Sequence, residues 1–320
     1  MNSTGLAPRW ASPPGETITE VASERGIAAA QLANGLGLSA SQLEELLAGV
    51  MPITWTLAQD LTNVVGASRE FWMTRDAQYR DDLRRVEADR WAQALPVRQM
   101  AEFGWIPKPA DWHDQIDTCL QFFDVGSPED WAHRYETALG TAHFRKSETF
   151  DLQAAATTAW FRACEAQAQR QSAAEFDRDR FIEILLELRS LTRISDPVHF
   201  LPALIDVCAR AGVVVVVVRP PSGCPVSGVA RHHQGRPLIQ LSARHLSDDH
   251  FWFSMFHEAG HVMLHSLDHT YIDEFDDQHA SVGNRIEAEA NTFAQEHLLP
   301  HGVAVPPQPD RRAIIRAAQA

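Results

Sequence analysis

The segment His257-Glu258-Ala259-Gly260-His261 carries two imidazoles and a carboxylate at a spacing that suits metal chemistry. Residues four apart on an α-helix lie on one face, about 6 Å apart along the axis, so His257 and His261 can reach the same ion. Glu258 can then face a water molecule beside that ion. This H-E-x-x-H spacing predicts Zn²⁺ held by the histidines, with the glutamate as general base for hydrolysis.

The residues around this motif favour a buried helix. Ser247 is a suitable N-cap, Asp248 and Asp249 follow in the first turn, and residues 250–256 are strongly apolar. A core helix whose histidines pair with neighbouring polar groups is the alternative interpretation. A third metal ligand elsewhere in the chain would favour the metal site over the core helix.

A catalytic zinc usually takes three protein ligands, so a third must come from elsewhere in the chain. His265 follows His257 by eight residues, about 12 Å along a continuous helix, which is too far for a shared ion. It is expected to support the site from outside the ligand set, or to be an ordinary polar residue at the helix end. In the predicted helix 285–294, Glu287 can ligate while Asn291 steadies the site by hydrogen bonding. Glu289 is expected to face solvent.

These residues resemble the ImmA/IrrE family of metallopeptidases. The resemblance covers the histidine motif, the segment 287–294 and Leu298-Leu299-Pro300, and extends upstream through 226–230 and 237–242. It implies strands leading to an active-site helix, and a protein substrate, because known members act on repressor proteins. The site residues that it implies are the zinc ligands His257, His261 and Glu287 and the base Glu258.

The sequence before the motif independently predicts a small sheet. Residues 213–218 form an uninterrupted valine run between Gly212 and Pro220, typical of a buried strand and far too short for a membrane span. Two further short strand-like segments follow. We expect an extended substrate peptide to lie along an exposed edge of this sheet.

Two features beyond the ligands bear on catalysis. Tyr271, His265 and His269 are candidates to stabilise a developing oxyanion or contact substrate. Relatives continue through further helices after the segment that corresponds to Pro300, whereas here only residues 301–320 follow. This difference predicts an incomplete wall around the peptidase site.

The other end of the chain carries a second signal. Leu32 and Ala33 are expected to end one helix, Gly35 and Gly37 to permit a tight turn, and Ser39 to cap the next helix, 41–49. With residues 56–61 and 71–72, this stretch resembles the XRE-type helix-turn-helix domain of HigA-like antitoxins. The resemblance implies a partner that is a toxin or a DNA operator. If DNA is bound, Ser39, Ser41 and Gln42 are the residues expected to face the bases.

The charges of this region argue against easy DNA binding. Arg25 is the only basic residue between Glu16 and Gly66, against six acidic ones, whereas phosphate contacts need Lys and Arg. Five arginines on the next helix are either phosphate contacts or partners of the acids interleaved with them: Arg69, Arg75, Arg80, Arg84 and Arg85.

Bulk properties favour a two- or three-domain protein of the α+β class, mostly helical. The 320 residues are expected to divide into a disordered lead (1–15), a helix-turn-helix domain with a long helix (16–95), a helical scaffold able to carry dimerisation (96–200), and a zincin-like domain with a small sheet (201–320). The net charge of −14 disfavours nucleic acid and anionic membranes. Four cysteines without C-x-x-C spacing indicate reduced thiols in the cytoplasm.

Three functions are compatible with these observations. The first is a zinc-dependent metallopeptidase that cleaves a protein partner, such as a repressor, and is coupled to the helix-turn-helix domain. The second is a DNA-binding transcriptional regulator or antitoxin in which the peptidase-like domain senses a signal or supports the structure. A protein-interaction module with neither activity is a third, in which the acidic N-terminal domain binds a basic toxin.

Overall fold

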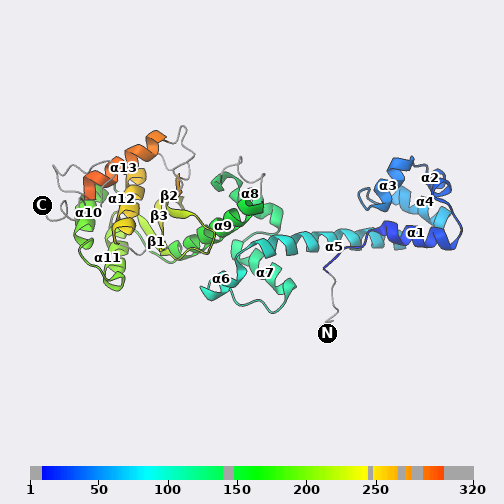
Figure 1. Cartoon of the computed structure of the whole chain (residues 1–320), viewed down its shortest axis with the longest axis horizontal. Coiled ribbons are helices and arrows are strands. Elements are labelled where there is room, and N and C mark those ends of the chain that lie inside the picture. The colour runs from blue at the N-terminus through cyan, green and yellow to red at the C-terminus, as the bar shows by residue number, and fades with distance from the viewer. Residues whose placement is uncertain (1–8, 140–147, 244–247, 266–270, 275–283, 299–320) are drawn as a thin grey trace. The chain divides into compact units, whose positions relative to one another are not determined.

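The computed structural model describes residues 9–139, 148–243, 248–265, 271–274 and 284–298. These residues form two compact units (Figure 1). Unit 1 comprises residues 1–93, 109–120 and 125–128, and unit 2 comprises 94–108, 121–124 and 129–320. The four-part division expected from the sequence stays a prediction. The first helix begins at Pro14, inside the segment expected to be a lead, because proline suits the first turn of a helix.

Unit 1 is helical. Its small core contains Ile18, Leu46, Leu61 and Trp72, all fully buried. The first five helices of the chain are α1 (Pro14–Glu24), α2 (Ala29–Leu36), α3 (Ala40–Leu47), α4 (Trp55–Val65) and α5 (Arg69–Ala94). The indole nitrogen of Trp72 donates a hydrogen bond to the carbonyl of Gly66 at 2.8 Å, which ties α5 to the loop before it.

The α2–α3 connection differs from the sequence expectation in one respect. α2 does not end at Ala33 but continues to Leu36, so Gly35 lies inside the helix rather than in the turn. A Cβ at Gly35 would lie 2.9 Å from a methyl group of Val64, so this glycine serves close packing against α4. Gly37 alone takes the left-handed conformation, with φ 68°, that ends α2.

Unit 2 joins helices to one sheet. The middle of the chain is helical as expected, with α6 (Val97–Glu102), α7 (Trp112–Phe123, mostly in unit 1), α8 (Pro128–Leu139), α9 (Glu148–Ala168), α10 (Arg178–Leu191) and α11 (Pro197–Arg210). The strands are β1 (Val214–Val218), β2 (Val226–His233), β3 (Arg236–Ser242) and β4 (Tyr271–Glu274), and the last helices are α12 (Asp248–Leu264) and α13 (Asn284–Leu298). The chain is therefore α+β and mostly helical, as the sequence predicts.

The sheet has the strand order β1-β3-β2-β4. β1 pairs with β3 in parallel, whereas β2 pairs with β3 and β4 in antiparallel fashion. β4 was not expected from the sequence, and its four residues are too few for a clear alternating pattern. The other three strands lie where the sequence predicts them.

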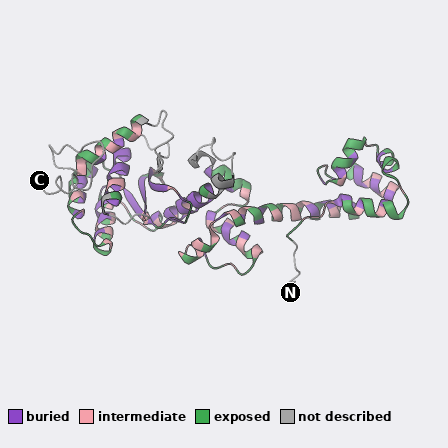
Figure 2. Cartoon of the chain, viewed as in Figure 1, coloured by how far each residue is buried: buried purple, intermediate pink, exposed green. Residues whose placement is uncertain are grey.

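The two faces of the sheet meet different helices. Val213, Val215, Ala230 and Ile239 belong to one core with α10, α11, α12 and α13. Because side chains alternate along a strand, their neighbours Val214 and Leu238 point to the other face, where α9 contacts β1. Figure 2 shows that the strands and α12 are largely buried.

All four cysteines are buried thiols: Cys119, Cys164, Cys208 and Cys224. Burial raises the pKa of the Cys119 thiol to about 12 and also raises the pKa of Cys164 and Cys208. Within the described ranges, none of the helices combines the length and apolar character needed to cross a bilayer.

Candidate metal centre

α12 carries the histidine motif and is held between the sheet and α13. It contacts β2 and β3, and its most extensive contacts are with α13. His257 and His261 are each 1% exposed, and Glu258 is 0% exposed. Three adjacent polar side chains of one helix are thus buried, which is costly unless they are paired or bind a ligand.

Glu287 of α13 meets the two histidines of α12. The Nε2 atoms of His257 and His261 lie 3.0 Å apart. Oε2 of Glu287 lies 3.1 Å from Nε2 of His257, and Oε1 lies 3.6 Å from Nε2 of His261. One ligand atom from each of these residues lies within 4.8 Å of the other two. The structure therefore brings together the three residues expected to bind zinc.

Electrostatics prepare these groups to bind a cation. Burial opposes ionisation of Glu287, but its contacts with the imidazoles of His257 and His261 outweigh this effect and lower its pKa to about 2. Burial lowers the pKa of His261, an effect that Glu287 partly offsets. At neutral pH the site therefore offers an ionised carboxylate and a neutral imidazole, the forms in which these side chains bind metals.

A second residue of α13 sets the orientation of the His257 ring. Nδ1 of His257 lies 3.0 Å from Oδ1 of Asn291. Because an amide oxygen only accepts hydrogen bonds, Nδ1 carries the proton and Nε2 keeps its lone pair. Such a contact fixes both the tautomer and the ring orientation of a metal-binding histidine.

His261 is oriented by a chain of two further residues. Nδ1 of His261 lies 3.1 Å from Nδ1 of His265, and Nε2 of His265 lies 3.1 Å from Oε2 of Glu289. The Glu289 carboxylate accepts the proton of His265 Nε2, which leaves His265 Nδ1 to accept the proton of His261 Nδ1. Nε2 of His261 is then free of a proton and faces His257.

This series of hydrogen bonds corrects one expectation from the sequence. Glu289 does not simply face solvent, since its carboxylate contacts His265 and accepts a hydrogen bond from Arg285 at 2.7 Å. α12 ends at Leu264, and the His265 side chain, 7% exposed, turns back toward His261. Glu289 and His265 reach each other across two helices, a contact that spacing along one helix does not predict.

Two glycines let the backbone approach the site closely. A Cβ at Gly260 would lie 3.1 Å from Cα of Ala290, so this glycine allows α12 and α13 to pack close together. A Cβ at Gly228 in β2 would lie 2.4 Å from Oε1 of Glu258. The sequence analysis missed both roles, although a glycine inside a strand is a known sign of close backbone approach.

Several expected site residues fall outside the described part of the chain. The side chain of Tyr271 is among them, although the backbone of Tyr271, in β4, pairs with that of Ala230 in β2. His269, Ser247 and residues 299–320 also lie outside the described residues, and with them the expected incomplete wall.

The residues expected to face DNA have local roles in α3. Ser39 caps the helix by accepting a hydrogen bond from the backbone nitrogen of Gln42, and the Gln42 side chain accepts one from the backbone nitrogen of Ser39. Ser41 is exposed.

The five arginines of α5 are engaged with groups of unit 1. Four pair with acids within four residues: Arg69 with Glu70, Arg80 with Asp76, Arg84 with Asp81 and Arg85 with Asp82. Arg75 instead donates hydrogen bonds to the backbone of Ser12 and Pro13. This pairing matches the interpretation of α5 as a solvated helix with balanced charges.

The donor set fits a zinc ion. Two imidazole nitrogens that face each other at 3.0 Å cannot both carry a proton, and a carboxylate completes the triangle. Two histidines and one glutamate are a known ligand set of catalytic zinc, which keeps a further position open.

Comparison with known proteins supports this interpretation for the C-terminal part of the chain. No curated protein and no solved structure matches the chain significantly. Residues 208–316 match the family Peptidase_M78, described as an IrrE N-terminal-like domain. This segment includes α12 and α13 and with them His257, His261 and Glu287. The C-terminal segment is therefore similar to the IrrE-type metallopeptidases, as its sequence predicts.

Proposed function

We propose that this protein is a zinc-dependent peptidase that cleaves a protein partner, and that unit 1 is a regulatory helix-turn-helix domain coupled to it. The convergence of His257, His261 and Glu287 beside a buried Glu258 is the observation that carries the proposal. These three side chains would hold the ion, and Glu258 would serve as the base. Four buried cysteine thiols support a reducing compartment such as the cytoplasm.

Each residue would have a distinct task in hydrolysis. Zinc, when bound, supplies a Lewis acid that polarises a carbonyl and makes water more acidic. Glu258 would accept the proton of the attacking water and pass it to the leaving amine. Asn291 and the pair His265–Glu289 would keep the ligand nitrogens facing the ion. The buried position of Glu258 would limit competing hydrogen bonds from solvent.

A comparison of Glu258→Gln with the wild type tests this function. The full chain, loaded with zinc, is incubated with a bacterial protein extract, and new protein N-termini are identified by mass spectrometry. We expect new termini with the wild type and with the control Glu183→Gln, a surface change on α10. We expect none with Glu258→Gln, although zinc content stays at the wild-type level. Equal cleavage by Glu258→Gln would refute the mechanism.

A DNA-binding regulator is the second candidate function. Its support is the turn between α2 and α3, where Gly37 ends one helix and Ser39 caps the next. The excess of acidic residues between Glu16 and Gly66 and the paired arginines of α5 weigh against it. We therefore propose a protein, rather than DNA, as the first partner of unit 1.

A further inference from the structure

α10 carries two large apolar side chains on the face that points away from the core of unit 2. Figure 1 shows α10 beside α13 at one end of this unit. Leu186 is 72% exposed and Ile182 is 43% exposed, and the two lie one helical turn apart. The opposite side of the helix contains its buried residues, which are Phe181, Ile184, Leu185, Leu188 and Leu191.

The two aliphatic residues belong to a longer stripe that also contains Asp179 and Arg189. At 3.6 residues per turn, these four positions fall within an arc of roughly 80° around the helix. The charged residues are about 15 Å apart along the axis, and the aliphatic residues about 6 Å apart. Position 184 lies midway between Asp179 and Arg189 and also midway between Ile182 and Leu186. The stripe therefore has one centre, with an acid at one end and a base at the other.

A stripe of this kind is complementary to a second copy of itself. If two α10 helices pack antiparallel about a twofold axis at position 184, Asp179 of each copy meets Arg189 of the partner copy. The same axis places Ile182 of each copy against Leu186 of the partner copy. A parallel pair would instead place Asp179 against Asp179 and Arg189 against Arg189. The charges of the stripe thus favour the antiparallel arrangement.

The charged ends of the stripe are available for a partner. In the described part of the chain, neither Asp179 nor Arg189 forms an ion pair with another side chain. Their places in the first and last turns suit the helix dipole, but this effect does not explain the two exposed aliphatic residues between them. The other four charged residues of α10 bind groups of their own chain: Arg178 the carbonyl of Met263 at 3.2 Å, Arg180 Glu183 at 3.2 Å, and Glu187 Arg210 at 2.7 Å.

We propose that two copies of this chain form a dimer in which the α10 helices pack antiparallel across a twofold axis. Ile182 and Leu186 form its apolar centre, and an Asp179–Arg189 pair closes each end. One helix from each copy buries less than the roughly 1,200 Å² of a standard interface, so the dimer is weak and reversible. It uses none of the candidate metal ligands, so this inference stands apart from the proposed peptidase activity.

Sedimentation equilibrium of the full chain measures the dissociation constant of the dimer. The protein is examined from about 5 to 500 µM, a range that suits a weak interface, and at low salt, because exposed ion pairs are screened. We expect a monomer–dimer equilibrium in the wild type, with and without a chelator. Leu186→Glu places a charge in the apolar centre and should weaken dimerisation at least about tenfold. A wild type that stays monomeric, or equal dimerisation in Leu186→Glu, overturns the proposal.

Charge reversal tests the antiparallel arrangement. Asp179→Arg places two arginines together at each end of the dimer, and Arg189→Asp places two aspartates together. Each variant alone should therefore dimerise at least about tenfold more weakly than the wild type. An equimolar mixture of the two should dimerise again, because both ends of the mixed dimer then join opposite charges. Circular dichroism of each variant checks that the helices persist.

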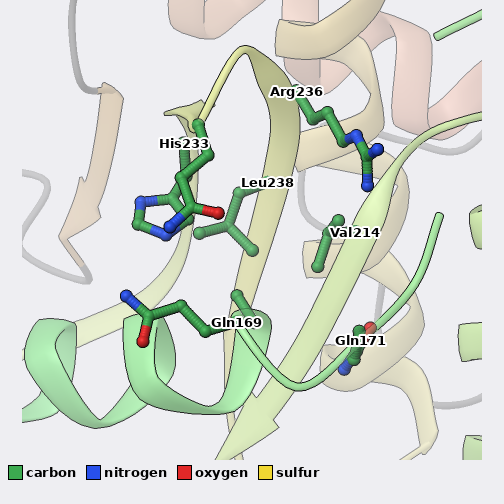
Figure 3. A pocket seen from close by; sticks show the side chains of 8 residues that line it. Gln169, Gln171, Val214, His233, Arg236 and Leu238 are labelled. Carbon is green, nitrogen blue, oxygen red and sulfur yellow. The ribbon is translucent and has the colours of Figure 1, made fainter. Parts of the chain in front are cut away.

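Two matched controls make the same changes of charge away from α10. Glu129→Arg changes an exposed acid in the first turn of α8. Arg236→Asp changes an exposed arginine beside a pocket of about 190 Å³, on the face of the sheet opposite to α10 (Figure 3). Both controls should dimerise as the wild type does. Wild-type dimerisation in either charge-reversal variant of α10, or no recovery in their mixture, overturns the proposal.

Discussion

Gly228 of β2 lies against the carboxylate of Glu258, the residue proposed as the base. A Cβ at position 228 would lie 2.4 Å from Oε1, 2.8 Å from Cγ and 2.9 Å from Cδ of Glu258. The strand thus forms one wall of the space that this side chain occupies. Because the contact involves the end of a flexible side chain, a larger residue at 228 should displace Glu258 rather than unfold the sheet.

Gly228→Ala should therefore impair cleavage and leave the zinc ligands in place. A base displaced by about 1 Å can lose about 100-fold in rate, so we expect a loss of that order in kcat/KM. Zinc content is measured by atomic absorption, and cleavage with a substrate found in the N-terminus experiment. Ser227→Ala, on the same strand, is the control and should keep its activity. Loss of zinc in Gly228→Ala would show that the wall supports the ligands instead.

Glu289→Ala should weaken zinc binding although Glu289 is not a proposed ligand. Without its carboxylate, nothing fixes the His265 proton on Nε2, and the orientation of His261 is lost. Removal of such a supporting group typically costs about 10- to 100-fold in metal affinity. Competition with a chromogenic chelator measures this affinity.

Two controls separate the role of Glu289 from a general effect of charge on α13. Glu296→Ala removes an exposed acid from the same helix and should bind zinc normally. Arg285→Ala removes the other partner of Glu289 but keeps its contact with His265. Wild-type affinity in Glu289→Ala would contradict the proposed hydrogen-bond chain.

Zinc should stabilise unit 2, because its ligands come from two helices that the ion would link. At a free zinc concentration 100-fold above Kd, the gain is about 2.7 kcal/mol, which corresponds to a rise in Tm of roughly 5 to 10 °C. We expect this rise in the wild type and in Glu258→Gln, and none in Glu287→Ala. Differential scanning calorimetry with and without a chelator provides the measurement. A full rise in Glu287→Ala would exclude this residue as a ligand.

The full chain should bind random-sequence duplex DNA weakly at physiological salt. α3 carries two acids, Glu44 and Glu45, and the arginines of α5 are already paired. Fluorescence anisotropy over a salt series tests this expectation, because phosphate contacts would make affinity fall steeply with salt. Tight binding that weakens with salt, and is reduced by Ser41→Ala, would favour the DNA-binding regulator instead.

Much of the candidate site could be predicted from the amino-acid sequence alone. The spacing of His257 and His261 defines a shared helix face, and a ligand from a second amphipathic helix is a small further step. The valine run at 213–218 predicts its strand, because β-branched residues favour strands and the flanking Gly and Pro mark where the strand ends. The contact of Glu287 with both histidines then follows the expected arrangement.

The contacts between elements could not be predicted in the same way. Gly228 meets Glu258, and Glu289 meets His265, only because the sheet and two helices pack in one particular way. Gly35 looked like a turn residue, but its closeness to Val64 depends on how α2 packs against α4. The local preferences of the residues contain no information on such distances, so these contacts are visible only in the folded structure.

The buried thiols provide a built-in reporter of unfolding. Cys119 belongs to unit 1, whereas Cys164, Cys208 and Cys224 belong to unit 2. A maleimide should modify none of them until the surrounding helices open, and mass spectrometry then reveals which part of the chain opened first. Denaturant titrations could thus follow unit 1 and unit 2 separately, and no cysteine would have to be introduced for labelling.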